Sequence, residues 1–411
     1  MKSIILHPSF FIFHSERRAG VRMKILGIVA EYDPFHSGHL FHMAEAVRRV
    51  SPDLVFVVLS PCFKQRGDLS LLSPLDRARL ALEAGADAVF SLPVLWTVRD
   101  AEHYALGAVS LLSKLGVTDL AFGAETADES MLLRAADLLE NPLPAFSALL
   151  KEKLSAGTGY PAALSGAFSS VLPEAGSLLD RPNNILAVCY LRAMLRLNLP
   201  LRHVIIRRAG SYHAAGIDPV SPSASAIRDS LLRGSYAAAF EAVPSYTANL
   251  LRRRFLEGFV PDGHILDTML LSRLRTMSEE EYRLLPDLSE GMENALRSAA
   301  AVSCTRDELI SALSGRRYPA ARISRICASA LLGISKSETE TASLPDHALL
   351  LGLRKRPEMT ALWKSLPVPV IASFTEWKKT ALPSDLAAWR IWAQCSGLPD
   401  TLPFSEKLIS I

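Results

Sequence analysis

The sequence predicts an α/β fold, with a doubly wound parallel sheet in the N-terminal part and a mostly helical C-terminal part. Two observations predict this fold class. Short apolar runs alternate with helical repeats from residue 25 to about residue 235, and this alternation is typical of strands joined by crossover helices. Beyond residue 236 the strand signals fade, while leucine, alanine and arginine recur at helical spacing. A chain of 411 residues is long enough for two domains.

The expected elements follow one another along the chain. Residues 25–30 form an apolar run that suits a strand buried on both faces, and Gly38 then opens a helix with an apolar face. A helix over residues 74–84 has proline in its first turn, where the missing N–H is tolerated. Further strands are expected at residues 54–59, 88–92, 120–122 and 204–206, and further helices at residues 101–115 and 185–197.

The amino-acid composition excludes several classes of protein. The chain is 49% hydrophobic and 21% charged, which is sufficient for a sizeable core. Its five cysteines include no C-x-x-C pair, so we expect neither a disulfide framework nor a zinc knuckle, and we expect a reducing, cytoplasmic location. The net charge of +3 allows a nucleic-acid partner only if positive charge is clustered. No membrane span and no obligate protein partner are indicated.

Residues 1–22 do not fit the pattern of the rest. They hold a short apolar run broken by His7 and Pro8, and their basic residues follow that run. A secretory signal would place the basic residues first and a small-residue cleavage site last. We therefore expect a non-core extension, a functional start at Met23, an α/β domain over residues 23–235 and a mostly helical domain over residues 236–411.

Residues 31–42, Glu-Tyr-Asp-Pro-Phe-His-Ser-Gly-His-Leu-Phe-His, lie where the first strand turns into the first helix. Ligands bind at this edge of open α/β sheets, and the N–H groups of a helix start attract phosphate. His36 and His39 are three residues apart, so both rings can face such a phosphate, and Gly38 lets the backbone approach closely. We predict a nucleotide triphosphate site in which His36 and His39 are catalytic. Each would stabilise charge on the α-phosphate and pyrophosphate by about 3–4 kcal/mol.

Two other interpretations of the histidines remain open. They could be hydrogen-bonded structural residues, or His36, His39 and His42 could bind one metal ion. Their spacing spreads the rings around the helix, which is poor geometry for three ligands of one ion. We therefore predict no protein-bound metal here.

Other loops at predicted strand ends carry polar residues suited to ATP. Lys64 and Arg66 follow the second strand and offer charge to phosphates or to a carboxylate, and Gly123 permits close packing against adenine or ribose. Asn183 and Asn184 precede a helix and either cap it or bind nucleotide; capping is the favoured local interpretation. Two more such places are the strand end at residues 207–208, with two arginines, and the helix start at residues 223–228.

Residues 27–42 resemble the N-terminal signature of the bacterial tRNA(Met) cytidine acetate ligases. The similarity continues in Gln-Arg-Gly at residues 65–67, Phe-Gly-Ala-Glu at 122–125, Pro-Asn-Asn-Ile-Leu at 182–186 and residues 223–228, and covers about residues 23–335. The H-x-G-H tetrad is shared by a whole nucleotidyltransferase superfamily. The E-Y-x-P-F-H-x-G-H extension and the P-N-N-I-L element are more specific.

The resemblance implies a Rossmann-like, ATP-binding catalytic domain and a tRNA-binding helical domain. ATP and acetate would form acetyl-adenylate, and the acetyl group would pass to N4 of the wobble cytidine of elongator tRNA(Met), giving N4-acetylcytidine. The cytosine amine is a poor nucleophile because its lone pair is delocalised, which explains the need for an activated anhydride. Magnesium is expected with the triphosphate. The ATP-binding residues implied are Val29, Ala30, Glu31, Tyr32, Asp33, Pro34, Phe35, His36, Ser37, Gly38, His39, Leu40, Phe41, His42, Gly123, Asn183, Asn184, Arg207, Arg208 and Ser225.

This chain departs from the family pattern near the tetrad. Pro61 and Cys62 stand where the family has glycine and asparagine, and Asp33 and Ser37 replace the usual asparagines. Proline removes a backbone donor and fixes φ. If the loop at residues 60–63 lines the acetate pocket, acyl choice or acetate affinity would differ here.

A group of arginines is the candidate RNA-binding feature of the helical domain. Arg322 and Arg325 share a helix face beside Tyr318. Such clusters contact phosphates, and an aromatic ring can stack an unpaired base, although most arginine runs are solvated helix faces. The predicted tRNA-binding residues are Arg316, Arg317, Arg322 and Arg325.

Two other functions compete with the acetate ligase. A small-molecule adenylyltransferase would use the same nucleotide site, but it needs no long arginine-bearing C-terminal domain. A catalytically silent tRNA-binding protein would not need the intact histidine tetrad. Ile-Ser-Lys-Ser at residues 334–337 is similar to a phosphate motif of class I aminoacyl-tRNA synthetases, but a solvated helix end is the favoured interpretation.

Overall fold

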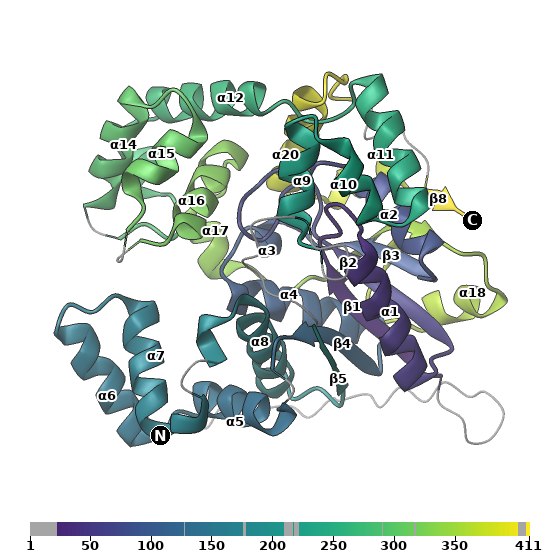
Figure 1. The fold of residues 1–411 in the computed structure, drawn as a ribbon, viewed down its shortest axis with the longest axis horizontal. Helices are drawn as coiled ribbons and strands as arrows, with labels where there is room; N and C mark the ends of the chain where they lie inside the picture. Colours follow the sequence, from purple (N-terminus) through teal and green to yellow (C-terminus); the bar gives the residue numbers. More distant parts are fainter. Residues whose placement is uncertain are drawn as a thin grey trace, which may run out of the picture.

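The computed structural model describes residues 23–126, 128–175, 178–208, 217, 222–289, 291–315, 318–401 and 408–411. The N-terminal extension at residues 1–22 therefore lies outside the described residues. Figure 1 shows a central sheet with helices on both of its faces and a separate group of helices to one side. The predicted α/β fold class is confirmed.

One sheet organises the molecule. Its strand order is β5-β4-β1-β2-β3-β6-β7, and β8 pairs with β6. The strands β1 to β5 are parallel to one another, and β6 runs antiparallel to β3. The chain moves outward from β1 to β3 and then returns to place β4 on the other side of β1, so the strand order reverses between β1 and β4. The strands are β1 Ile25–Ala30, β2 Leu54–Leu59, β3 Ala88–Ser91, β4 Asp119–Ala124, β5 Arg202–Arg207, β6 Ala348–Leu353, β7 Val370–Ile371 and β8 Ile409–Ser410.

Helices cover both faces of the sheet because neighbouring strand residues point to opposite sides. Leu26 and Ile28 belong to the core formed with α1 (Ser37–Val50) and α2 (Pro74–Glu83). Ile25 belongs to the core formed with α4 (Ala101–Lys114), α5 (Glu129–Glu140) and α8 (Pro182–Arg196). The strands and helices predicted before residue 210 are thus confirmed, with shifts of one to three residues at their ends.

The remaining helices of this part serve as connections and edges. In Figure 1, α6 and α7 form a hairpin that projects beside α5, and α9, α10 and α11 cross the top of the sheet near α1. The bounds are α3 Val94–Thr97, α6 Pro144–Ser155, α7 Tyr160–Val171, α9 Ala224–Leu232, α10 Tyr236–Glu241 and α11 Ser245–Glu257, with 3-10 turns at Pro173–Ala175 and Leu178–Asp180.

A group of helices between residues 263 and 341, called here the helical unit, builds a core of its own. Leu274, Leu296, Leu309 and Ile323 are fully buried in it. Figure 1 shows the unit beside the sheet, joined to it through α12 and α16. Its helices are α12 Gly263–Thr276, α13 Glu279–Arg283, α14 Met292–Val302, α15 Arg306–Leu313, α16 Ala320–Leu332 and α17 Lys336–Thr341.

The expectation that strands end before residue 236 is wrong. Helices do predominate after that point, but β6, β7 and β8 return to the sheet beside β3. The run Leu349-Leu350-Leu351 is apolar on both faces, and periodicity cannot tell such a strand from a buried helix. The last helices, α18 Pro357–Trp363, α19 Phe374–Thr380 and α20 Pro383–Cys395, pack around this added edge. The boundary between the two domains at residue 236 stays a prediction.

Gly67 shows how closely the helical unit is packed against the α/β part. Its φ is +82°, and a Cβ there would stand 2.6 Å from the carbonyl oxygen of Ser324 in α16. Gly157 has a φ of +81° but open space around it. Gly67→Ala should therefore destabilise by about 1–3 kcal/mol more than Gly157→Ala, because both introduce left-handed strain but only the first adds a backbone clash.

Thermal unfolding of the two variants measures this difference. Equal Tm losses in Gly67→Ala and Gly157→Ala would contradict the packing of α16 on the loop that holds Gly67.

Candidate active site

The H-x-G-H tetrad lies where the strand order reverses. β1 ends at Ala30 and α1 begins at Ser37, so residues 31–36 form the turn between them. Open α/β sheets bind ligands in this crevice. Tyr32 has a φ of +48°, which is costly for a residue with a side chain and is typical of functional turns. Phe35 packs edge-on against the Tyr32 ring, with centroids 4.7 Å apart.

The two histidines predicted to be catalytic cap their own helix. The Nδ1 atom of His36 accepts a hydrogen bond from the N–H of Gly38 at 3.1 Å, and the Nδ1 atom of His39 accepts from the N–H of His36 at 3.3 Å. An accepting Nδ1 assigns the proton of a neutral ring to Nε2. The rings are stacked, with centroids 3.7 Å apart. The site therefore holds two Nε2–H donors side by side on the start of a helix.

Burial and nearby arginines keep these rings neutral. Burial first, and then the charges of Arg208 and Arg228, lower the pKa of His36 to about 3. The pKa of His39 is lowered well below its usual value by burial, by His36 and by Arg208. Burial and Arg208 likewise lower the pKa of His42 to about 4. Neutral rings can stack without repulsion, and they act as hydrogen-bond donors.

His42 occupies a different position from the other two. Its ring is hydrogen-bonded to the backbone of Phe122 in β4, and its buried Nε2 has no hydrogen-bond partner. No group of three His, Cys, Asp or Glu side chains within the described ranges has the arrangement of a metal site.

Glu125 ties the end of β4 to the start of α8. Its carboxylate accepts hydrogen bonds from the N–H groups of Asn183 and Asn184 at 3.1 and 2.7 Å. The side-chain oxygen of Asn184 accepts in return from the N–H groups of Glu125 and Thr126 at 2.9 and 3.1 Å. The local interpretation, in which the asparagines cap their own helix, is wrong. Glu125, 58 residues away in sequence, caps α8, and Asn184 secures the β4 loop.

Arg208 connects this loop to the histidines. Its Nη1 donates to the side-chain oxygen of Asn183 at 3.2 Å, and its aliphatic stem lies 3.2 Å from the position of a Cβ on Gly123. The charge of Arg208 also acts on all three histidines of the tetrad region. The structure thus brings together Gly123, Asn183, Arg208 and the histidines, as the sequence predicted. Arg207, the preceding residue, is exposed at the end of β5.

The helix start at residues 223–228 reaches the same turn. Arg228 of α9 donates from Nη1 to the main-chain oxygen of Asp33 at 2.6 Å. Ser225 lies in the first turn of α9, and its hydroxyl is 2.7 Å from that of Ser223. The pairing of Arg228 with the turn before His36 could not be read from the sequence, because 195 residues separate the two partners.

Asp33, one of the departures from the family pattern, is balanced by Lys64. The Lys64 Nζ lies 3.1 Å from Oδ2 of Asp33, and both side chains are buried. The other oxygen of Asp33 accepts the N–H of Leu71 at 2.7 Å. Burial opposes ionisation of Asp33, but the neighbouring cations, first Lys64 and then Arg228, hold its pKa below the usual value. Lys64 is thus paired with a carboxylate of the protein itself, and its contact with a ligand stays a prediction.

The other unusual residues lie in the framework of the loop after β2. The main-chain oxygen of Pro61 accepts from the guanidinium of Arg77, and Cys62 is fully buried. Burial raises the pKa of the Cys62 thiol, so it is an inert, neutral core group. Sequence analysis missed Arg77 because nothing in its local pattern distinguishes it from a surface arginine.

The predicted RNA-binding arginines on α16 are paired within the protein. Arg322 donates to the main-chain oxygen of Asp287 and stands 5.5 Å from the centre of the Tyr318 ring. Arg325 lies 3.5 Å from the Asp287 carboxylate. Their shared helix face beside Tyr318 is thus confirmed, while binding to tRNA stays a prediction. Residues 316–317, which hold the predicted Arg316 and Arg317, lie outside the described residues.

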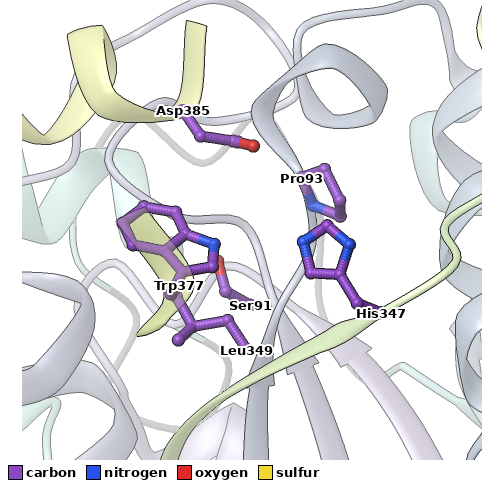
Figure 2. A pocket seen from close by; sticks show the side chains of 6 residues that line it. All are labelled: Ser91, Pro93, His347, Leu349, Trp377 and Asp385. Carbon is purple, nitrogen blue, oxygen red and sulfur yellow. The ribbon is translucent and has the colours of Figure 1, made fainter. Parts of the chain in front are cut away.

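One remaining sequence feature, the segment at residues 334–337, has a structural role. Ser335 caps α17 in a reciprocal arrangement with Glu338, which agrees with the helix-end interpretation of residues 334–337. A small cavity lies at the carboxyl end of β3. Asp385 and His347 are among the side chains that line it (Figure 2). It holds about 10 Å³, room for a single water. Burial raises the pKa of Asp385 to about 6, and its carboxylate accepts the N–H of Val94 at 2.6 Å.

Two features bear on the class of protein. All five cysteines are free. In the part of the chain that the structure describes, no helix is long and apolar enough to cross a membrane.

Comparisons with known proteins agree with this geometry. A profile of the family described as HIGH Nucleotidyl Transferase matches residues 23–400. The tRNA(Met) cytidine acetate ligase of Fervidobacterium nodosum is 32% identical over 357 residues, which cover 85% of this chain and 84% of that protein. The enzyme of the same name from Bacillus subtilis is 30% identical over 399 residues, or 94% of each chain.

Two crystal structures of Thermotoga maritima TmcAL share the fold. The apo form I has a TM-score of 0.89 at 26% identity and covers 95% of this chain and 100% of that chain. Form II, bound with alpha-thio ATP, has a TM-score of 0.87 at 25% identity and the same coverage.

The Asp33–Lys64 pair yields a stability prediction. Asp33→Asn or Lys64→Met alone should cost on the order of 3 kcal/mol, because each leaves a buried charge without its main partner. The double variant should be close to the unsubstituted protein in stability, since both charges are then gone. Urea unfolding measures the three values. A double variant that loses the sum of the two single losses would show that the residues stabilise the fold independently.

The lowered histidine pKa values predict a pH-dependent stability. Between about pH 6.5 and 3, a histidine of the unfolded chain is protonated, whereas His36 of the folded protein stays neutral. The free energy of unfolding therefore falls as the pH is lowered. Each such group contributes up to about 1.4 kcal/mol per pH unit. His36→Asn keeps an acceptor for the Gly38 N–H but removes the titration. Its unfolding free energy, measured in urea at pH 7 and pH 5, should fall less than that of the unsubstituted protein. An equal fall in both proteins would mean that His36 titrates in the folded state as it does in the unfolded chain.

Proposed function

Because this chain belongs to the HIGH Nucleotidyl Transferase family and, within it, to the tRNA(Met) cytidine acetate ligases, we propose that it activates acetate with ATP and acetylates N4 of the wobble cytidine of elongator tRNA(Met). The observation that carries this proposal is the pair of neutral, stacked histidines at the β1–α1 turn. Their two Nε2–H groups, fixed by backbone hydrogen bonds, suit a phosphoryl group in transfer better than a carbonyl or a metal.

In the first half-reaction, an acetate oxygen attacks the α-phosphorus of ATP, and the bond to the pyrophosphate oxygen breaks. His36 and His39 donate hydrogen bonds to the oxygens on which charge develops, and the positive end of the α1 dipole lies at the same turn. Since the donors are already in position, little reorganisation is needed during the reaction. Arg208 and Arg228 supply positive charge near the triphosphate.

In the second half-reaction, the cytidine N4 attacks the acyl carbon of acetyl-adenylate. The N4–carbon bond forms, the acyl–oxygen bond to phosphate breaks, and AMP leaves with the electron pair while N4 loses a proton. AMP is a good leaving group because its phosphate stays anionic. The same donors that stabilise the first transition state also hold the phosphate of AMP during its departure.

Adenosine is proposed to lie between the ends of β4 and α8. Gly123 offers a surface without a side chain beside Arg208, and Asn183 is held there by Glu125. Asn184 contributes indirectly, because its side chain is 1% exposed and binds the β4 loop. Arg207 and Ser225 are proposed to contact the phosphates.

Magnesium is expected to reach the site together with ATP. In the described residues, the turn supplies no pair of unoccupied carboxylates, since Asp33 is already bound to Lys64 and to the N–H of Leu71. This donor set fits an ion held mainly by phosphate oxygens and water, the usual arrangement for magnesium-bound nucleotides. The chemistry that such an ion would supply is neutralisation of charge on the departing pyrophosphate.

The helical unit is proposed to hold the tRNA, with Arg322 and Arg325 beside Tyr318 and with Arg316 and Arg317 in the preceding segment. Clustered arginines contact phosphates, and a neighbouring aromatic ring can stack an unpaired base of the anticodon loop. A tRNA substrate implies a cytoplasmic location.

Incubation of the purified protein with ATP, magnesium, labelled acetate and bulk unmodified tRNA tests the proposal. Digestion and mass spectrometry should reveal acetylated cytidine that depends on ATP. Release of pyrophosphate with some other acid or phosphorylated small molecule, and no acetylated cytidine, would instead support a small-molecule adenylyltransferase.

Variants of the two units should separate the half-reactions. His39→Ala should lower acetate-dependent ATP–pyrophosphate exchange by roughly 10²–10³-fold, the cost of one preorganised donor, and leave tRNA binding nearly intact. Arg322→Ala combined with Arg325→Ala should weaken tRNA binding and leave the exchange intact. Thermal melting checks that both variants are folded. If either variant lost both activities equally, this division of roles would be wrong.

A further inference from the structure

The loop after β2 bridges the nucleotide site and the helical unit. At its far end, Arg306 of α15 donates from Nη2 to Oδ1 of Asp68 at 2.6 Å and to the main-chain oxygen of Gly67 at 3.4 Å. Ser324 of α16 donates from its hydroxyl to the main-chain oxygen of Arg66 at 2.6 Å. Residues 64–68, called here the bridge loop, are therefore held by two helices of the other unit.

At its near end, the bridge loop reaches the turn that carries the tetrad. Lys64 is only 3% exposed, and its Nζ lies between two carboxylates. The nearer is Asp33 at 3.1 Å, three residues before His36, and the farther is Asp68 at 4.0 Å. One buried ammonium group thus has two anionic neighbours at unequal distances.

This arrangement favours a second cation for Asp68. A single ammonium group cannot fully satisfy two carboxylates. Asp33 is buried and also has Nη1 of Arg228 at 3.5 Å from its Oδ2, whereas the Asp68 side chain is 39% exposed. Arg306, whose side chain is 14% exposed, supplies the partner of Asp68. Burial opposes ionisation of Asp68, but Lys64 and then Arg306 hold its pKa below the usual value. Lys64 is then left to Asp33.

We propose that Arg306 is a positioning residue of the nucleotide site: by pairing with Asp68, it commits Lys64 to Asp33, so the helical unit sets the charge of the turn before His36. The helical unit then has a role in adenylation that is separate from holding RNA. The inference rests on the proposed function where it is tested by acetate-dependent pyrophosphate exchange. It does not rest on that function where it is tested by the binding of ATP.

Loss of the Arg306 charge has a definite consequence. Asp68 would turn toward Lys64, which is its nearest remaining cation. The Lys64–Asp33 contact would weaken, and Asp33 would then depend on Arg228, whose Nη1 lies 3.5 Å from its Oδ2, so less positive charge would be left for the triphosphate. ATP, which carries several negative charges, would bind more weakly even in the absence of tRNA.

The test uses the full-length chain without tRNA. Arg306→Gln keeps a hydrogen-bonding side chain but removes the charge. It should raise both the ATP dissociation constant from calorimetry and the KM for ATP in acetate-dependent pyrophosphate exchange. The expected rise is on the order of tenfold, with kcat changed less, which is within the range for residues of one ion-pair network.

A second substitution distinguishes charge from mechanical attachment. In Asp68→Asn with Arg306→Gln, the competing carboxylate is gone, so Lys64 should again be committed to Asp33 and the ATP dissociation constant should return to within about twofold of the unsubstituted value. A purely structural link would be lost in both variants, and the double variant would then bind ATP no better than Arg306→Gln.

Arg297→Gln is the matched control, because Arg297 pairs with Glu279 on the helical unit at 2.9 Å and is half exposed. It should leave ATP binding unchanged. Unchanged ATP binding in Arg306→Gln, or no recovery in the double variant, would overturn the proposal. Absence of acetate-dependent exchange in the unsubstituted protein would count against the proposed function, while calorimetry would still decide the role of Arg306.

Discussion

The site depends on one buried guanidinium. Arg77 of α2 is fully buried and donates to the main-chain oxygens of Glu31 at 2.7 Å and Ser60 at 2.9 Å, as well as to that of Pro61. These carbonyl groups end β1 and β2, where the ladder of the sheet no longer satisfies them, and leaving them buried without donors would be costly. Only arginine offers several N–H groups in a rigid fork, so lysine could not hold both strand ends. Because one of these bonds goes to the main-chain oxygen of Pro61, Arg77 does not depend on the side chain at that position.

The charges around the tetrad have two effects that reinforce each other. In the proposed function Arg208 and Arg228 attract the triphosphate. After burial, the charge of Arg208 also keeps His36 and His39 neutral, and Arg228 adds to this effect at His36. If the rings were protonated in the free protein, they would repel each other at 3.7 Å and would disturb the helix start that they cap. Neutral rings with fixed Nε2–H groups avoid this repulsion and still donate.

What could be predicted from the sequence was local. The strand at residues 25–30, the helix that follows it and the tetrad between them depend on neighbouring residues, and all three are found where the pattern placed them. The interactions that were missed join distant segments. Glu125 caps α8 across 58 residues, and Arg228 reaches the turn before His36 across 195. β6 was missed for a related reason, since its apolar run becomes a strand only through pairing with β3.

The departures from the family pattern also show that interactions between distant segments cannot be predicted from local sequence. Taken singly, Asp33 is an added negative charge beside a phosphate site, which should oppose the binding of ATP. The structure places Lys64 against it in the buried interior, with Asp68 and Arg306 next in line. The charge at residue 33 is thus one member of an alternating series that begins at the tetrad and ends in the helical unit. In the sequence, Asp33, Lys64, Asp68 and Arg306 are four ordinary charged residues. In the structure they lie in a row, and this row couples the proposed phosphate site to the helical unit, which carries the arginines of α16.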